Sequence, residues 1–197
     1  MEKLHHQLRI YKKEDCIPFR KTKEKFGGLS NMASGYSLII NGNRIRPSEA
    51  LYQACRYPLF PEIQKEIIIQ RSPMTAKMKS KKYYKKTRQD WEDVRFKIMK
   101  WCIEIKLFQN WDKFSTLLAQ TENKPIVEDT PKNKIWGAVL KEGKYEGVNA
   151  LGRLLMELRN KYVIHHQIPN IVPPPKITGF LLYGEFINGY NLSLIHI

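Results

Sequence analysis

The sequence has few of the residues that build covalent or metal-bound frameworks. Its 197 residues include only three cysteines, Cys16, Cys55 and Cys102, and no CxxC spacing. Such cysteines indicate neither a disulfide framework nor a zinc site. The histidines include two adjacent pairs, at 5–6 and 165–166, with no third ligand at metal spacing. We therefore expect no metal and no cofactor.

Long apolar runs and common catalytic signatures are also missing. No stretch approaches the ~20 apolar residues of a membrane span, and the N-terminus lacks the apolar core of a signal peptide. We therefore expect a cytoplasmic protein. The chain contains no phosphate-binding loop and no GxGxxG, HExxH or GxSxG motif, so the enzyme classes that depend on these motifs are not indicated.

Acidic residues are scarce relative to basic ones. The chain has 34 lysines and arginines against 19 aspartates and glutamates, which gives a formal net charge of +15. Such an excess repels itself and favours a polyanionic partner, either nucleic acid or a phosphorylated ligand. A basic protein without such a partner is the alternative that composition leaves open.

The strongest helical pattern runs from Asp90 to Gln109. Apolar residues recur there at steps of three and four, which places them on one face of an α-helix. This face consists of Trp91, Val94, Ile98, Trp101, Ile105 and Phe108. Asp90 is the predicted N-cap. Because a helix of this length spans roughly 30 Å, we expect a long central helix in a single compact domain that is α+β, mainly helical, with a few short strands.

Shorter elements are predicted on both sides of this helix. The Asn-Gly pair at 41–42 predicts a β-hairpin over residues 36–46, because it supplies the positive φ angles of a type I′ turn. Further helices are expected at 47–57 with Ser48 as N-cap, at 62–70, from Ser72-Pro73 onward, at 111–119, and after Asn149 as N-cap. Short strands are expected at 126–129 and 135–139.

The two ends of the chain differ from its middle. Residues 1–25 are polar and lysine-rich, and we expect a basic flexible segment there, followed by the main domain at 26–162. Residues 163–197 are predicted to form a proline-rich C-terminal tail, with a hairpin around Tyr183-Gly184. The last residues, 192–197, match the translation of a common sequencing-library adapter, and we assign them no function.

Three carboxylates and one lysine are candidates for chemistry. Glu49 follows a predicted helix cap, where free N–H groups and the helix dipole would hold it ionised. Glu128 and Asp129 end an apolar strand, where a carboxylate is either solvated or aimed into a cleft. Lys106 lies at the margin of the buried face of the long helix. It either extends to water or is desolvated, with a lowered pKa, and acts as a nucleophile. Pattern alone favours structural roles for the carboxylates.

A basic run that contains two aromatic residues precedes the long helix. Its members are Lys77, Lys79, Lys81, Lys82, Tyr83, Tyr84, Lys85, Lys86 and Arg88. The run either follows a phosphate backbone while its rings stack on bases, or it is a solvated basic loop. Among the tryptophans, Trp136 is the one expected to offer an exposed stacking surface.

Seven ordered segments resemble the NADAR family. They are Gly28–Asn31, Ser48–Ala54, Asp90–Glu92, Ile105–Leu107, Val127–Asp129, Ile135–Gly137 and Gly147–Arg159. The resemblance covers about residues 26 to 160. It implies an N-glycosidase that acts on ribosylated nitrogen, as the YbiA-like members do. One branch hydrolyses ribosylamino-pyrimidine phosphates of the riboflavin pathway. Another removes ADP-ribose from guanine bases in DNA, as the antitoxin of a DarT-type ADP-ribosyltransferase toxin.

The residues of these motifs resemble the second branch more closely. The riboflavin branch more often has a histidine directly after the motif glutamate, and Ala50-Leu51 replaces it here. We therefore expect ADP-ribosylated DNA as the substrate and a DarT-type toxin encoded nearby as a partner. Hydrolysis of a riboflavin-pathway intermediate, or non-catalytic binding of ADP-ribose or DNA, are the alternatives.

The resemblance also assigns roles to particular residues. Glu49 would be the principal catalytic carboxylate and Glu128 the second. Lys106 would bind a phosphate or hydroxyl, or attack the ring-opened sugar as a Schiff base. The residues expected to contact substrate are Ser30, Asn31, Trp91, Asp129, Trp136, Asn149 and Arg159.

Overall fold

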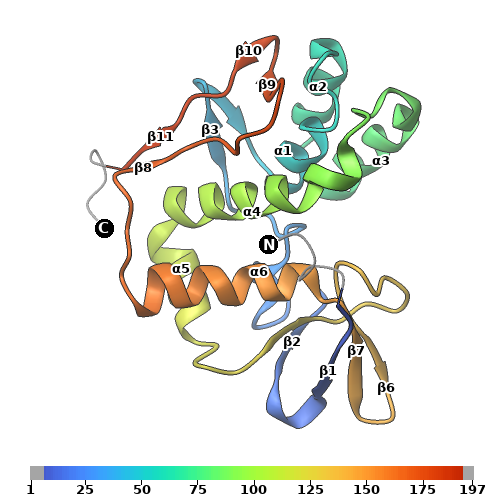
Figure 1. Cartoon of the computed structure of the whole chain (residues 1–197), viewed down its shortest axis with the longest axis vertical. Helices are drawn as coiled ribbons and strands as arrows, with labels where there is room; N and C mark the ends of the chain where they lie inside the picture. Colours follow the sequence, from blue (N-terminus) through green and yellow to red (C-terminus); the bar gives the residue numbers. More distant parts are fainter. Residues whose placement is uncertain (1–6, 193–197) are drawn as a thin grey trace. The chain divides into compact units, whose positions relative to one another are not determined.

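The computed structural model describes residues 7–192, which combine six α-helices with short strands (Figure 1). The prediction of an α+β, mainly helical fold is confirmed. The first six residues of the predicted N-terminal segment and the adapter-like residues 193–197 lie outside the described range.

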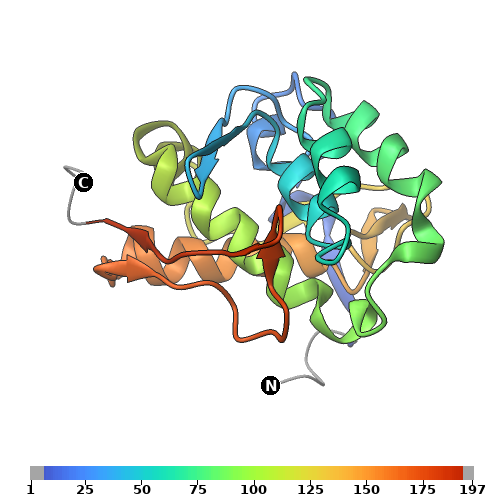
Figure 2. The same ribbon diagram turned by 90° about the horizontal axis from the view of Figure 1, so that it is seen from above.

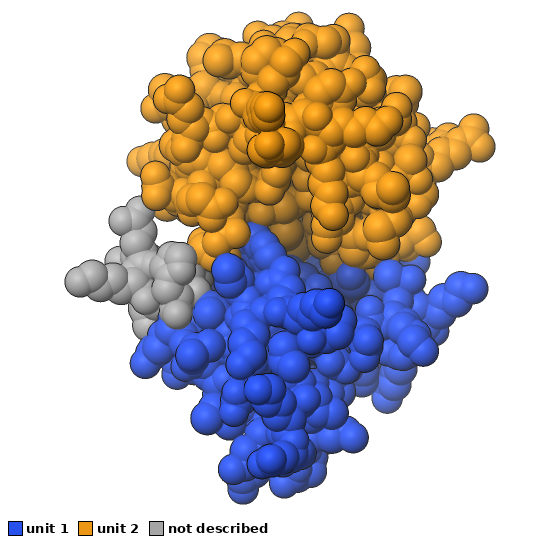
Figure 3. All heavy atoms as spheres, turned by 90° about the vertical axis from the view of Figure 1, so that its right-hand side faces the viewer, with its two compact units in different colours: residues 1–30, 112–168 blue, residues 31–111, 169–197 orange. Residues whose placement is uncertain are grey.

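The chain forms two compact units, each built from two separate stretches of sequence (Figure 3). Unit 1 contains residues 1–30 and 112–168, and unit 2 contains residues 31–111 and 169–197.

Unit 2 is a helical cluster with short hairpins at its margin. Its helices are α1 (Ser48–Ala54), α2 (Pro61–Ile68), α3 (Pro73–Lys82), the single turn η4 (Tyr84–Lys86) and α4 (Trp91–Gln109). Helices α1, α2 and α3 pack against one another, and α1 also packs against α4. Ser72 accepts a hydrogen bond from the backbone N–H of Thr75, as expected for the N-cap of α3.

Helix α4 is the predicted long helix. All six residues of its predicted apolar face are buried, and burial extends to the opposite side as well. Twelve of its 19 residues are buried. A helix that is buried nearly all round lies inside a core rather than on a surface. The periodicity was therefore sufficient to find the helix but underestimated how deeply it is buried.

Two helix caps differ from the sequence prediction. The N-cap of α1 is Pro47, whose backbone is extended, and Ser48 is already helical. The Ser48 hydroxyl therefore donates to the backbone carbonyl of Asn31 (3.1 Å). Asp90 occupies the N-cap position of α4, but its carboxylate does not cap the helix. It accepts two hydrogen bonds from the Arg88 guanidinium, at 2.6 and 3.0 Å, and this contact lowers the pKa of Asp90.

The Asn-Gly hairpin forms where the sequence predicts it. Strands β3 (Leu38–Ile40) and β4 (Asn43–Ile45) pair antiparallel, with Ile40 opposite Asn43. Asn41 and Gly42 both have positive φ, 46° and 74°, as a type I′ turn requires.

Residues 169–192, the described part of the C-terminal stretch, contact the helices of unit 2 (Figure 2). This stretch contains the antiparallel pairs β8 (Ile171–Val172) with β11 (Tyr190–Asn191), and β9 (Leu181–Leu182) with β10 (Glu185–Phe186). The predicted hairpin around Tyr183-Gly184 is confirmed, since both residues have positive φ. Gln64 of α2 donates to the Leu181 carbonyl (2.9 Å) and accepts from the Tyr183 N–H (2.7 Å).

Unit 1 carries two small sheets and the helices α5 and α6. The first sheet has the order β1 (Arg9–Lys12), β7 (Lys144–Gly147), β6 (Val139–Lys141), and all its pairs are antiparallel. The second pairs β2 (Ile17–Phe19) in parallel with β5 (Ile126–Glu128). The other elements are η2 (Lys13–Asp15), η3 (Gly27–Leu29), α5 (Trp111–Ala119), α6 (Ala150–Leu158) and the π-helical turn η5 (Arg159–Ile164). The first residue of α5, Trp111, is assigned to unit 2, and the rest of this helix belongs to unit 1. Helix α6 packs on β5.

Unit 1 departs from the sequence prediction at two places. Residues 9–12 and 17–19 form strands although the sequence predicts a flexible segment, because each finds a partner strand far along the chain. The prediction of a strand at 135–139 is wrong. Strand β6 begins only at Val139, and a turn at Glu142-Gly143, where both residues have positive φ, connects it to β7.

Residues 7–192 contain neither a membrane-spanning helix nor a metal-binding cluster. No helix there is long and apolar enough to cross a membrane. Three or more His, Cys, Asp or Glu side chains do not gather anywhere in that range in an arrangement able to hold a metal ion.

Candidate active site

Glu49 lies in the first turn of α1 and is almost completely buried, at 5% exposure. The Asn31 side-chain amide donates to its Oε2 (2.7 Å), and the Gln53 amide donates to its Oε1 (2.8 Å). Gln53 reaches the carboxylate because it lies four residues later on the same helix face. The Ser48 hydroxyl donates to the Asn31 backbone carbonyl and restrains Asn31, whereas Gln53 is restrained because it is part of helix α1.

Burial raises the pKa of the Glu49 carboxyl above its usual value, because the charged form loses its hydration. Four groups act in the opposite direction: the hydrogen bond from Gln53, the charge of Lys77, the hydrogen bond from Asn31 and the charge of Arg56. A carboxyl balanced in this way can exchange a proton nearer to neutral pH than an exposed glutamate can. This property suits a general acid or base.

An aromatic and cationic stack lies next to Glu49 in unit 2. The Trp91 ring is 5.2 Å from the Tyr52 ring, centroid to centroid, and the Arg56 guanidinium carbon lies 4.4 Å from the Trp91 centroid. Burial and the charge of Glu49 raise the pKa of Tyr52 well above its usual range. The phenol therefore remains protonated at neutral pH.

Three polar atoms of this region have no hydrogen-bond partner anywhere in the part of the chain that the structure describes. They are Asn31 Oδ1, Arg56 Nε and Trp91 Nε1. Buried polar atoms are nearly always satisfied by protein, water or ligand. A ligand or water that reached these atoms would meet one acceptor and two donors.

Lys106 is fully buried in α4, and its Nζ lies 4.2 Å from the centroid of the Tyr36 ring. The prediction that its ammonium extends to water is wrong, because the whole side chain is enclosed in the core of unit 2. A cation over the face of a tyrosine ring is stabilised by the ring quadrupole. Burial is also the condition that the nucleophile hypothesis requires.

In unit 1, Asn149 holds the strand end that carries Glu128. Asn149 has a left-handed backbone, with φ 51°, and its side chain does not cap α6 as predicted. It donates instead to the Ile126 carbonyl (2.8 Å) and accepts from the Glu128 N–H (3.0 Å). A Cβ at Gly152 would collide with the Ile126 carbonyl oxygen and the Asn149 amide. Glycine therefore permits this close approach of α6 to β5.

The remaining predicted residues of unit 1 make backbone or internal contacts. The half-buried Asp129 bridges to Ala138, and the backbone carbonyl of the half-buried Trp136 accepts from the Leu151 N–H (3.0 Å). Arg159 is buried and donates to the Thr121 hydroxyl and the Lys124 carbonyl, each at 2.8 Å. Ser30 is buried, and its N–H donates to the carbonyl of Gly27 (3.1 Å).

The contacts of Glu49 and Glu128 lie within a region that matches a known protein family. The model of the NADAR domain matches residues 18–162, which include the Asn31–Glu49–Gln53 contacts and the Asn149–Glu128 contact. The chain belongs to the NADAR family. The resemblance predicted from seven sequence segments is therefore confirmed at the level of the family.

Several NADAR proteins are similar to this chain. N-glycosidase YbiA of Escherichia coli K12 is 32% identical over 151 residues, which cover 77% of this chain and 91% of that protein. The chloroplastic riboflavin biosynthesis protein PYRR of Zea mays is 33% identical over 161 residues, but these are only 25% of its length. The NMR structure of E. coli YbiA has a TM-score of 0.66 at 28% identity and covers 85% of this chain and 94% of that one.

Two residues near Glu49 received no role in the sequence prediction, although they contact Glu49 or Trp91. Gln53 was part of a matched segment but received no role, although its spacing of four from Glu49 on a helix was a usable signal. Arg56 follows that segment, and no local pattern shows that it stacks on Trp91, which is distant in sequence.

The basic run of this NADAR protein contains both exposed side chains and side chains that contact neighbouring residues. Lys77, Lys81, Lys82, Tyr84, Lys85 and Lys86 are exposed, whereas Lys79, Tyr83 and Arg88 are partly buried. Arg88 binds Asp90 and donates to the Thr178 carbonyl (2.8 Å). The solvated-loop alternative is wrong for residues 77–82, because they are helical.

Proposed function

We propose that this NADAR protein is an N-glycosidase that hydrolyses the bond between ribose C1 of ADP-ribose and a guanine base in DNA. The observation that carries the proposal is the buried Glu49 carboxylate, held by two amide donors among polar atoms without partners in residues 7–192. The names of the YbiA relatives support the N-glycosidase chemistry.

Cleavage of a ribosyl C1–N bond builds positive charge on the sugar ring. In the proposed reaction, the ionised Glu49 stabilises that charge or takes a proton from the attacking water. The water oxygen bonds to C1, the C1–N bond breaks, and a proton is delivered to the leaving base. The amides of Asn31 and Gln53 keep the carboxylate in one orientation during this sequence.

Two further residues have proposed roles in the reaction. Glu128 is the second carboxylate, on the motif that follows β5. Lys106 either binds a phosphate or hydroxyl of the substrate or forms a Schiff base with the ring-opened sugar. In the Schiff-base version, the ribose ring opens to an iminium between C1 and the guanine nitrogen, and the lysine nitrogen adds to C1. The guanine amine takes a proton and leaves, which gives the lysine Schiff base, and water then hydrolyses this to the C1 aldehyde and free lysine.

The DNA-linked substrate is supported by charge and by sequence. The net charge is +15, and the exposed lysines of the basic run have no acidic residue between them in the sequence. Ala50-Leu51 after the motif glutamate resembles the DNA-acting branch of the family. A DarT-type ADP-ribosyltransferase toxin is the partner that this activity implies, and its gene in the neighbouring reading frame would support the proposal.

A parallel assay tests the substrate. Purified protein is incubated with guanine-ADP-ribosylated oligonucleotide and, separately, with a ribosylamino-pyrimidine phosphate, and product release is followed by mass spectrometry. The proposal expects release of ADP-ribose and restored guanine from the first substrate. Turnover of the pyrimidine alone would contradict it and would favour the second candidate function, which the name of the maize relative supports.

A non-catalytic module is the remaining alternative. It would bind the modified oligonucleotide without releasing product, and Glu49→Gln would bind as well as the wild type. Borohydride added during turnover, followed by peptide mapping, tests the lysine mechanism separately. A reduced adduct on Lys106 supports the Schiff base, whereas its absence during active hydrolysis leaves Lys106 with the binding role.

A further inference from the structure

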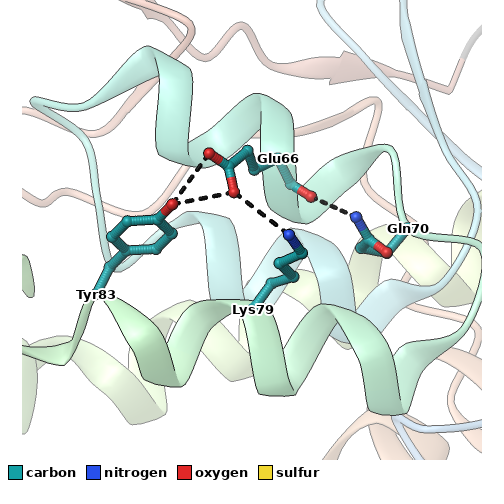
Figure 4. Close-up of polar contacts among 4 residues, drawn as sticks. All are labelled: Glu66, Gln70, Lys79 and Tyr83. Carbon is teal, nitrogen blue, oxygen red and sulfur yellow. Dashed lines mark hydrogen bonds and ion pairs between the residues drawn. The ribbon is translucent and has the colours of Figure 1, made fainter.

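Helix α3 presents two different faces. Ala76 and Ser80 are buried, and the Tyr57 hydroxyl donates to the Ser80 carbonyl (2.6 Å). Lys79, three residues after Ala76, and Tyr83, three residues after Ser80, turn toward Glu66 of α2 (Figure 4). One face of α3 is thus committed to packing inside unit 2.

Glu66 binds the two residues of the basic run that lie on this inner side. The Tyr83 hydroxyl donates to both carboxylate oxygens, each at 3.0 Å, and Lys79 Nζ lies 3.7 Å from Oε2. The Gln70 amide donates to the Glu66 carbonyl (2.9 Å). The expectation that both neighbouring tyrosines stack on bases therefore needs revision, because Tyr83 is oriented toward α2.

Away from this face, α3 and the turn η4 that follows it carry exposed cations and one exposed aromatic ring. We call this set the α3 track; it consists of Lys77, Lys81 and Lys82 of α3 and Tyr84 and Lys85 of η4. All five are exposed, and Tyr84 is 64% exposed. An exposed ring flanked by lysines matches the chemistry of a polynucleotide strand, in which anionic phosphates alternate with flat bases.

The α3 track begins close to Glu49. Helices α1 and α3 pack against each other, and the positive charge of Lys77 lowers the pKa of Glu49. From Lys77 to Lys82 the helix rises roughly 7.5 Å, so its lysines extend away from the end of the track that lies near Glu49. A strand along the track would thus have one nucleotide near the carboxylate and its neighbours over the lysines.

We infer that the α3 track binds the unpaired DNA strand that flanks the modified nucleotide, with phosphates on the lysines and one base stacked on Tyr84. This inference rests on the proposed function for its choice of DNA. An unpaired strand is specified because a base can cover the Tyr84 ring only when it is not stacked within a duplex.

Binding of an unmodified, fluorescently labelled single-stranded oligonucleotide tests the track without any catalysis. The variant Lys81→Glu/Lys85→Glu is expected to raise the Kd at least tenfold and to lower the slope of log Kd against log salt by about 2. The control Lys141→Glu/Lys144→Glu changes net charge equally, on the exposed ends of β6 and β7. It is expected to bind nearly as tightly as the wild type. Equal weakening by both pairs would overturn the inference.

Tyr84 is tested by a second pair of variants. Tyr84→Ala is expected to weaken binding of the single strand about tenfold, whereas Tyr84→Phe retains it, because the ring face supplies the contact. A duplex of the same sequence is expected to bind more weakly and to be insensitive to Tyr84→Ala. Tyr84→Ala binding equal to that of the wild type would overturn the stacking role.

Failure of the α3 track and failure of the proposed function give different experimental results. If the track variants lose oligonucleotide binding but wild-type protein releases no ADP-ribose from modified DNA, the track is supported and the proposed activity fails. If wild-type protein hydrolyses modified DNA while Lys81→Glu/Lys85→Glu binds normally, the activity is supported and the track fails.

Discussion

Glu49 and Glu128 are both motif carboxylates, yet the protein restrains them in opposite ways. The Glu49 side chain is buried, and each of its oxygens accepts a hydrogen bond from an amide. At Glu128, the Asn149 amide instead binds the backbone N–H of a half-buried residue at the end of a strand. The first arrangement controls the protonation and orientation of a carboxylate, whereas the second controls the position of a chain segment. Two carboxylates that look alike as sequence motifs therefore have different structural roles.

The largest effect is expected from Glu49→Gln. It keeps the size of the side chain but removes the carboxylate, and loss of an acid–base group typically lowers a rate by ~10²–10⁴. The rate of product release from modified DNA measures this effect, and an unchanged melting temperature shows that the fold of the variant is intact. Wild-type turnover by this variant would remove Glu49 from the mechanism.

Asn149→Ala is expected to reduce stability rather than chemistry. It removes one buried and one partly buried hydrogen bond, worth about 1 kcal/mol each, and places alanine in a left-handed conformation at a cost of about 1 kcal/mol. Urea unfolding should therefore show a loss of about 3 kcal/mol. Asn123→Ala, at an exposed position, should change stability by less than about 0.5 kcal/mol. A raised KM without any loss of stability would instead support the substrate-binding role of Asn149.

Gln53→Ala is expected to shift the pH dependence of hydrolysis. The hydrogen bond from Gln53 is the largest of the contributions that lower the pKa of Glu49, so its loss raises that pKa further. If ionised Glu49 is the active form, the acidic limb of the rate profile moves to higher pH. Gln120→Ala, at an exposed glutamine, should leave the profile in place. A shift to lower pH would contradict this account.

Stability should respond to the same carboxyl. The raised pKa means that folded protein holds the Glu49 proton more tightly than the unfolded chain does. Stability therefore falls as pH rises from the usual glutamate range through the folded-state pKa. Glu49→Gln should flatten this part of the curve of unfolding free energy against pH. An equal slope in both proteins would show that other groups are responsible.

The smallest catalytic effect is expected from Glu128→Gln. Because the Asn149 contact fixes the backbone at this position, the strand end should keep its place in the variant. We expect turnover to fall about tenfold, which is below the range of ~10²–10⁴ for an acid–base group. A loss as large as that of Glu49→Gln would show that the two carboxylates contribute equally, and the comparison would need to be reversed.

The helices and local turns could be predicted from the sequence because their signals are local. Trp91, Ile98 and Ile105 repeat at helical spacing, and Asn41-Gly42 has the residues that a tight hairpin turn requires. Tyr183-Gly184 gave a correct turn in a stretch that otherwise resembled a tail. Family motifs identified Glu49 and Asn31, which the structure joins by a hydrogen bond.

Features that depend on distant partners could not be predicted. Residues 9–12 are too short and too polar to indicate a strand, and they become one only by pairing with 144–147. The role of Asn149 was also out of reach, since capping is the common function of asparagine before a helix. Whether an amide instead binds a neighbouring strand depends on tertiary structure alone.

The alternation of the two units along the chain has a consequence for biosynthesis. Residues 31–111 leave the ribosome as one stretch and can assemble their helices early. Strand β2 must wait for β5, which is translated only after α4 and α5. Closing such a distant parallel pair is slow because its loop entropy must first be overcome. The helical cluster around Glu49 should therefore mature first on the nascent chain, and the segment carrying Glu128 should follow.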